Sequence, residues 1–213
     1  MTVVRKTLLG CLVLPLTCAV LLALCRVVDL ATSRVEPIDM QALLIDVSPF
    51  PHEWRRCIGP TQQPEHVHPE RGALEFWFVG FCPTRSDRFE QGIDGAEHDV
   101  FEYGNLLEAS VVFHVLFLRQ EFSDRYTLSP WSVPTGWSYT SQVADRFRFA
   151  CADIEPFEMG RVLTKCRIAA QYEEFVSVFG TTLDPSYMTL HDLERILVAI
   201  DERMALYLRK DTQ

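Results

Sequence analysis

The feature that most constrains this chain is an uncharged run of 19 residues at positions 7–25, TLLGCLVLPLTCAVLLALC. A helix over this run is roughly 28 Å long, close to the bilayer hydrocarbon core of about 30 Å. The apolar region of a secretory signal is usually shorter, at about 7–15 residues. We therefore predict a membrane span at 7–25, within an anchor and tether over residues 1–34, followed by one domain over 35–213.

Two other interpretations of the N-terminus stay open. Ala31 and Ser33 are small residues two positions apart, a pattern that a signal peptidase accepts, so cleavage is one alternative. Lipid attachment at Cys25 is the other, although Leu24 stands where a lipoprotein carries a small residue.

The charges around the span predict its orientation. Arg5 and Lys6 precede it, whereas Arg26 is soon followed by Asp29. The positive-inside rule then places the N-terminus in the cytoplasm and the domain outside, in the periplasm or the extracellular space. The net charge of the whole chain is −9 although residues 1–34 are positively charged, so the domain is strongly acidic. Such a domain is a poor binder of nucleic acid or of anionic lipid surfaces.

Small residues gather on one side of the predicted span. Cys11, Cys18 and Cys25 recur every seven residues, and Gly10 lies beside them. Small side chains let helices approach closely in lipid, so this face is a candidate packing surface for integral membrane subunits. The alternative is that these cysteines serve only as small apolar residues in contact with the bilayer.

Four further cysteines lie in the domain, at Cys57, Cys82, Cys151 and Cys166. An even number of cysteines outside the cytoplasm indicates disulfides, and four cysteines allow three pairings. We predict Cys57–Cys82 and Cys151–Cys166, because each pair brackets one short segment. The spacings contain no C-x-x-C, which argues against zinc, an iron–sulfur cluster or covalent haem.

Hydrophobic periodicity predicts an α+β domain, with an antiparallel sheet packed against a long C-terminal amphipathic helix. Alternation of apolar and polar residues predicts strands at 73–82, 145–151 and 162–172, and we expect the next strand at 174–183. Residues 110–119 are apolar on both faces, so we predict a central strand there, with a buried helix as the alternative. We also expect a short helix at 38–46 and a polar loop at 83–99.

The C-terminal helix is predicted from an apolar stripe at spacings of three and four residues, with Thr189 as its N-cap. The stripe consists of Leu190, Leu193, Ile196, Leu197, Ile200, Met204 and Tyr207.

Two segments are candidate binding sites. His66 and His68 could share a divalent metal with a third ligand from His52 or His98, although a solvated loop between Pro64 and Pro69 explains them more simply, and we predict no metal and no cofactor. The loop 129–139 carries three aromatic residues that we predict to contact a partner, namely Trp131, Trp137 and Tyr139. The alternative is that these rings only cover the sheet edge.

No pattern of catalytic residues emerges from the sequence. Ser138 lacks the second glycine of a nucleophile elbow, and neither a phosphate-binding loop nor a dinucleotide fingerprint is present. We therefore expect a non-catalytic accessory subunit of a membrane complex, for which a respiratory or photosynthetic electron-transfer complex is the example we name. The alternative is a free-standing, membrane-anchored module that binds a ligand or a metal.

Overall fold

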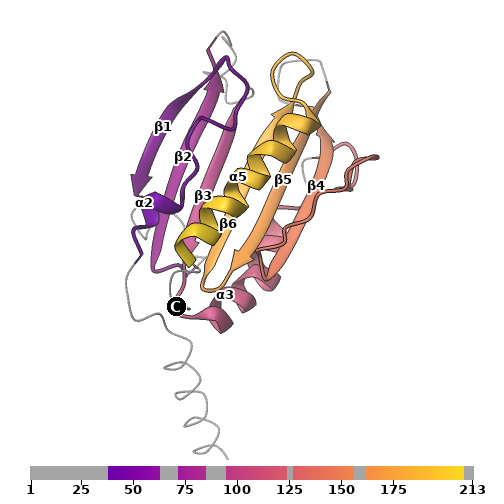
Figure 1. The fold of residues 1–213 in the computed structure, drawn as a ribbon. Helices are drawn as coiled ribbons and strands as arrows, with labels where there is room; N and C mark the ends of the chain where they lie inside the picture. The colour runs from indigo at the N-terminus through magenta and orange to yellow at the C-terminus, as the bar shows by residue number, and fades with distance from the viewer. Residues whose placement is uncertain (1–37, 63–71, 85–94, 124–126, 156–161, 209–213) are drawn as a thin grey trace, which may run out of the picture. The chain divides into compact units, whose positions relative to one another are not determined.

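A six-stranded antiparallel sheet with the strand order β1-β2-β3-β6-β5-β4 organises the domain in the computed structural model (Figure 1). The structure describes residues 38–62, 72–84, 95–123, 127–155 and 162–208, which belong to one unit, Pro37–Gln213. The strands are β1 (Trp54–Gln62), β2 (Glu75–Pro83), β3 (Ala96–Glu102), β4 (Arg146–Ile154), β5 (Leu163–Tyr172) and β6 (Phe175–Leu183).

The predicted span at 7–25, with Gly10, Cys11, Cys18 and Cys25, lies outside the described residues, as do His66 and His68. In the ranges that the structure does describe, no helix combines the length and apolar character needed to cross a membrane.

The sheet is built from two three-stranded meanders. Strands β1, β2 and β3 form the first, and β4, β5 and β6 form the second. Pairing of β3 with β6 joins them, from Ala96 opposite Thr181 to Glu102 opposite Phe175. The tight turn between β5 and β6 places Glu173 in the left-handed region, at φ 53°. Each meander is local in sequence, so only the β3–β6 pairing brings distant parts of the chain together.

Helices cover both faces of the sheet, and each face has its own apolar cluster. On the face that we call the α5 face, the long helix α5 (Leu190–Leu208) packs together with the segment 38–54, which contains α2 (Met40–Leu43). On the α3 face, a continuous helical run packs over β4, β5 and β6. This run consists of α3 (Leu106–Val112), the π-helical turn η4 (Phe113–Phe117) and α4 (Leu118–Gln120).

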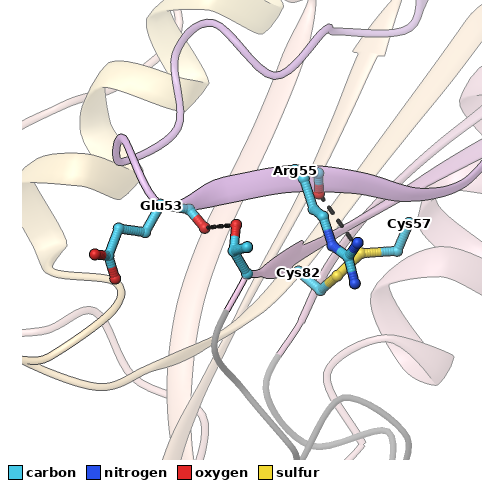
Figure 2. Close-up of a disulfide and its surroundings, with 5 residues drawn as sticks. Glu53, Arg55, Cys57 and Cys82 are labelled. Atoms are coloured by element: carbon cyan, nitrogen blue, oxygen red, sulfur yellow. Dashed lines mark hydrogen bonds between the residues drawn. A yellow bond between two sulfur atoms is a disulfide. The ribbon is translucent and has the colours of Figure 1, made fainter.

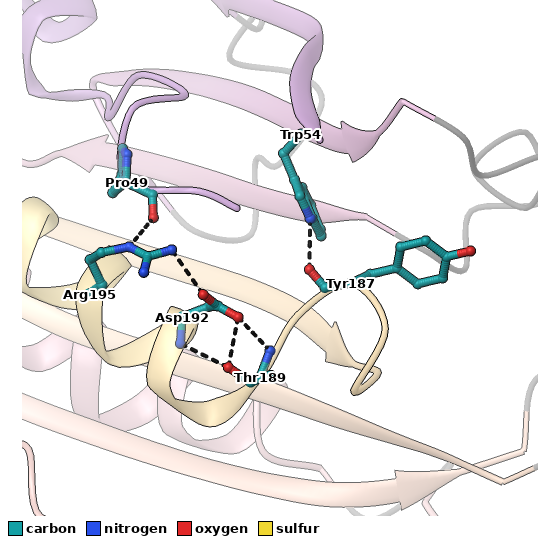
Figure 3. A network of polar contacts seen from close by, with 6 residues as sticks. All are labelled: Pro49, Trp54, Tyr187, Thr189, Asp192 and Arg195. Atoms are coloured by element: carbon teal, nitrogen blue, oxygen red, sulfur yellow. Dashed lines mark hydrogen bonds and ion pairs between the residues drawn. The ribbon is translucent and has the colours of Figure 1, made fainter. Parts of the chain in front are cut away.

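The fold confirms most of the predicted elements. The strands at 73–82, 145–151, 162–172 and 174–183 correspond to β2, β4, β5 and β6, and the C-terminal helix is α5. Thr189 caps that helix as expected, because its hydroxyl oxygen accepts a hydrogen bond from the Asp192 amide at 3.2 Å (Figure 3). The helix expected at 38–46 is confined to the four residues of α2.

The strand predicted at 110–119 is wrong, because this segment is helical. Asn105 caps the helix by accepting a hydrogen bond from the Glu108 amide at 2.9 Å, and the Glu108 carboxylate accepts one from the Gly104 amide at 3.1 Å. Ala109, Phe113 and Phe117 then point into the α3-face cluster at helical spacing. Val111 and Val115 lie on the exposed side of this helix, so apolar residues occur on both sides and hide the helical period in the sequence.

Two strands were not expected from the sequence. Part of β3 falls in the loop predicted at 83–99, so that prediction is wrong for its last four residues. In β3 the charged Glu97 and Asp99 alternate with the buried Ala96 and His98. Because neither buried residue is strongly apolar, the sequence of this part of the strand looks like that of a polar loop. Strand β1 contains arginines, a glycine and a proline, and much of it is exposed at the sheet edge.

Both disulfides form as predicted, one in each meander. Cys57–Cys82 joins β1 to β2 with a Cα–Cα distance of 6.0 Å (Figure 2). Cys151–Cys166 joins β4 to β5 at directly opposite positions, 4.0 Å apart between Cα atoms. Each meander therefore carries its own covalent cross-link, whereas the β3–β6 pairing is held by non-covalent contacts among the described residues.

Hydrogen bonds between residues distant in the sequence hold the segment 38–54 to α5 and to the turn before it (Figure 3). The Arg195 guanidinium donates to the Pro49 carbonyl at 2.9 Å, and the Trp54 indole donates to the Tyr187 carbonyl at 2.8 Å. The first bond satisfies a main-chain carbonyl of this irregular segment, the second satisfies one in the turn before α5, and together they hold the segment beside the C-terminal helix.

His98 connects this segment to the centre of the sheet. Its Nδ1 accepts a hydrogen bond from the Ile45 amide at 3.2 Å, and its Nε2 lies 2.9 Å from the Ser177 hydroxyl on β6. Because Nδ1 accepts, Nε2 carries the proton and donates it to Ser177. The ring is fully buried, and this burial, with a smaller contribution from the Arg203 charge, lowers the pKa of His98 to about 3.

The lowered pKa of His98 predicts a loss of stability in mild acid. Below the ordinary histidine pKa the unfolded chain binds a proton that the folded chain excludes, so the free energy of unfolding falls as the pH falls from 6.5 toward 3. The slope is at most about 1.4 kcal/mol per pH unit. Urea unfolding of the full-length chain in detergent at pH 7, 6 and 5 measures this slope. Most carboxylates titrate below this pH range, so they contribute little to it.

His98→Gln is expected to flatten this slope, because the variant has no imidazole to protonate at that position. The matched control is His191→Gln, since His191 is exposed at the start of α5. An equal slope in the wild type and in His98→Gln would contradict the prediction.

Candidate binding groove

A groove of about 750 Å³ runs along the free edge of β4. Its floor is the strand itself, over residues 146–150. One wall is the loop 131–140, and the other comes from η4 and α4 through Phe113, His114 and Leu118. The groove therefore lies where an outer strand of the sheet meets a loop and a helix.

The β4 backbone is closed at one end of the groove. Ser132 pairs with Cys151 through both main-chain bonds, at 3.0 and 2.9 Å, and the Leu128 amide donates to the Asp153 carbonyl at 2.6 Å. Asp153 completes this pairing by donating its amide to the Ser129 hydroxyl at 2.8 Å. Loop residues 128–132 therefore act as a short additional strand against one end of β4.

Further along β4 the backbone is open. The β4–β5 register is continuous from Arg146 to Ile154, and main-chain groups in a strand alternate between its two edges. Since Cys151 and Asp153 direct their N–H and C=O groups outward, Phe147 and Phe149 do so too. Within the described residues no hydrogen bond reaches these outward groups, because the loop has left the strand and the groove lies beside them.

Aromatic side chains line the groove on the α5 face. Phe147 and Phe149 project from β4 on this side. The Trp137 ring lies 4.1 Å from the Phe149 ring, between centroids, and the Tyr139 ring lies 5.9 Å from that of Phe147. These rings form an apolar surface on one side of the open strand edge.

Cationic side chains line the groove on the α3 face, because Arg146 and Arg148 alternate with the two phenylalanines. Arg146 donates to the Gln171 side-chain carbonyl at 2.6 Å and also to the Ser110 hydroxyl, which ties α3 to the sheet. The Arg148 guanidinium lies 4.5 Å from the centre of the Phe122 ring, and its side chain is exposed. The groove is therefore locally cationic on a domain that is acidic overall.

A buried carboxylate holds the loop in place. Asp201, on α5, accepts hydrogen bonds from the hydroxyls of Tyr139 at 2.6 Å, Tyr172 at 2.6 Å and Ser141 at 2.8 Å. Burial together with the Asp201 carboxylate raises the pKa of both tyrosines above the ordinary value, so the hydroxyls remain donors. This network joins the wall of the groove to α5 and β5.

All three aromatic residues predicted to contact a partner line the groove. Trp137 and Tyr139 lie on the α5 face, whereas Trp131 packs on the α3 face, with its ring 5.5 Å from that of Phe122. Each is half-buried. Their contact with a partner stays a prediction. The rings of Trp137 and Tyr139 pack against phenylalanines of the outer strand β4, as the alternative expected, and each is also partly exposed in the groove.

Sequence reasoning missed three polar residues of this region. The signal for Asp201 was its position four residues after Leu197, inside the apolar stripe of α5. Arg146 and Arg148 alternate with the phenylalanines of the strand predicted at 145–151, but the sequence does not show that this strand is an outer one with a groove beside it.

The structure offers no metal site in the part of the chain that it describes, where no three residues of the types His, Cys, Asp and Glu lie together. His98, considered as a third ligand, uses both ring nitrogens in structural hydrogen bonds.

The fold and the groove define an α+β domain with an open sheet edge beside an aromatic loop. Its fold is similar to the crystal structure of the extracellular domain of PknH from Mycobacterium tuberculosis, with a TM-score of 0.53 over 80% of this chain and 98% of that chain. The sequence identity is 9%, so the similarity concerns the fold alone. No family model matches the sequence, and no curated protein matches it.

The Asp201 network predicts a large loss of stability when the carboxylate is removed. Asp201→Ala leaves the hydroxyls of Tyr139, Tyr172 and Ser141 without their acceptor, and we expect the free energy of unfolding to fall by about 3 kcal/mol. Tyr172→Phe removes a single bond and should cost about 1 kcal/mol. Urea unfolding measures both changes.

The control is the neighbouring Glu202→Ala, which alters an exposed carboxylate and should change stability by less than about 0.5 kcal/mol. Equal effects of Asp201→Ala and Glu202→Ala would show that the network does not stabilise the fold.

Proposed function

We propose that this protein is a membrane-anchored, extracytoplasmic, non-catalytic binding domain, and that the groove beside β4 is its binding site. The observation that carries the proposal is the groove itself, which combines a volume of about 750 Å³, aromatic walls and open main-chain groups. Ligand sites in proteins are typically concave and largely apolar, with a few polar groups that orient the ligand.

Three observations support the location. Two disulfides lie in the domain, and disulfides persist in oxidising compartments. The uncharged run at 7–25 has the length of a membrane span, with basic residues before it. The structural neighbour is itself described as an extracellular domain.

The proposal includes no catalytic step. His98 is fully buried, and its ring serves the packing of the domain. Arg146 and Arg148 at the groove are cations that orient and attract a ligand, which is a binding role.

Binding of 8-anilinonaphthalene-1-sulfonate tests the groove, because this probe is aromatic and anionic. We expect the full-length chain in lipid nanodiscs to enhance its fluorescence saturably, above the signal of empty nanodiscs. Ser138→Glu places a negative charge in the groove wall, so we expect affinity to fall by about tenfold.

The matched control is Ser186→Glu, which adds the same charge at an exposed turn that does not line the groove. If the wild-type signal equals that of empty nanodiscs, or if both variants bind the probe equally well, the groove is not the binding site and the proposal is wrong.

The accessory-subunit role is a second candidate, and one observation favours it. Three apolar side chains follow each other at intervals of four residues on the outer side of the α3–η4 run, with exposed fractions of 61%, 54% and 50% for Leu107, Val111 and Val115. This row is a surface that a membrane-complex subunit could cover.

Isolation from native membranes tests the second candidate. If it holds, a tagged chain extracted in mild detergent should carry integral membrane subunits in stoichiometric amounts, identified by mass spectrometry. The triple variant Leu107→Ser, Val111→Ser and Val115→Ser should lose them, whereas Leu206→Ser, at an exposed position on α5, should retain them. Purification of the wild-type chain alone would exclude this role.

A further inference from the structure

We propose that the groove binds an extended peptide segment of a partner protein, which adds to the sheet as a strand antiparallel to β4. Its side chains are acidic and apolar in alternation. This inference rests on the proposed function and specifies the ligand of the same groove.

The open backbone of β4 is the first argument. Phe147 and Phe149 direct two N–H and two C=O groups toward the groove, while the β4 groups beyond them are already paired with loop residues. An unpaired strand edge is a template for another strand, and its main-chain hydrogen bonds do not depend on the sequence of the ligand. The stretch 146–150 accommodates about five residues of such a strand.

The opposite edge of the sheet does not offer the same template. Strand β1 pairs with β2 through two register shifts, one between Arg56 and Ile58 and one between Ile58 and Thr61. Pro60, within the second shift, has no N–H group to donate. Irregular pairing of this kind protects an edge from strand addition, whereas the register of β4 is continuous.

The two faces of β4 determine the side chains that the added strand should carry. Successive residues of a strand point to opposite faces, and residues directly opposite in an antiparallel pair share a face. Peptide residues opposite Phe147 and Phe149 therefore meet the aromatic rings of Trp137 and Tyr139. The alternate residues lie on the face that carries Arg148, where a carboxylate gains an opposite charge.

A second copy of this chain fits the edge less well. Antiparallel pairing of two β4 strands centred on Arg148 would place the two Arg148 side chains directly opposite each other, and like charges in that position destabilise the pair.

A fluorescein-labelled peptide of alternating sequence, Val-Glu-Val-Glu-Val-Glu, tests the proposal by fluorescence anisotropy with the full-length chain in nanodiscs. We expect it to bind at least about tenfold more tightly than Val-Val-Val-Glu-Glu-Glu, which has the same composition and charge without the alternation. We also expect the amides of Phe147 and Phe149 to gain protection from hydrogen exchange when the peptide is present.

Backbone methylation of the peptide distinguishes strand addition from other modes of binding. In the antiparallel arrangement the valines lie opposite Phe147 and Phe149, so the valine N–H groups face β4 and the glutamate N–H groups face away. N-methylation of the valines should weaken binding by at least about tenfold, and N-methylation of the glutamates should leave it nearly unchanged.

Two charge reversals on the protein test the acidic specificity. Arg148→Glu should weaken binding of the alternating peptide by about tenfold, whereas Arg119→Glu, an exposed change on α4 that does not line the groove, should have little effect. Each substitution lowers the net charge by two, so the two variants have equal net charge and a difference in affinity between them reports the groove alone.

Three results would overturn the proposal. They are equal affinity for the alternating and block peptides, equal effects of methylation on valine and glutamate, and protection of the Phe147 and Phe149 amides by self-association without peptide. If the anilinonaphthalene probe binds while the alternating peptide does not, only this inference fails. If neither binds, the proposed function fails with it.

Discussion

Strands β3 and β6 are the only neighbours in the described sheet that come from different meanders. Their pairing runs over the full length of β3, from Ala96 to Glu102, and it aligns the two halves of both apolar clusters. His98 reinforces it from the buried side, because its imidazole reaches Ser177 on β6 and the Ile45 amide. The packing of α5 across both meanders, and with it the position of the aromatic loop, depends on this pairing.

In the groove, a loop that is anchored at both ends lies beside a strand edge whose main-chain groups are open. Its loop is attached at one end through the pairing of Ser132 with Cys151, and at the other through Tyr139 and the buried Asp201. Between these attachments the edge of β4 is open. The phenylalanines of β4 lie on the α5 face and its arginines on the α3 face. A binding surface prepared in this way loses little conformational entropy when a ligand arrives.

The sequence predicts the second meander well and the first one poorly. Strands β4 and β5 show clean alternation because one face of each carries charged residues, whereas β3 places charged residues within a segment that resembles a loop. The helical run after Asn105 was misassigned because its outer side is apolar, which masks the helical period. Disulfide pairing followed from spacing, and the aromatic loop from composition, but the groove required knowing that β4 is an outer strand.

The separation of the paired strands also determines the order in which the domain can be completed during synthesis. His98 and Ser177 are 79 residues apart, so β3 has no neighbour on its second edge until β6 has been made. Contacts that close so long a loop form late, whereas the hairpins of each meander and the disulfide within it need only nearby residues. The first meander therefore passes through a stage in which β3 is an exposed outer strand, the stage at which the nascent chain is most open to aggregation through that edge.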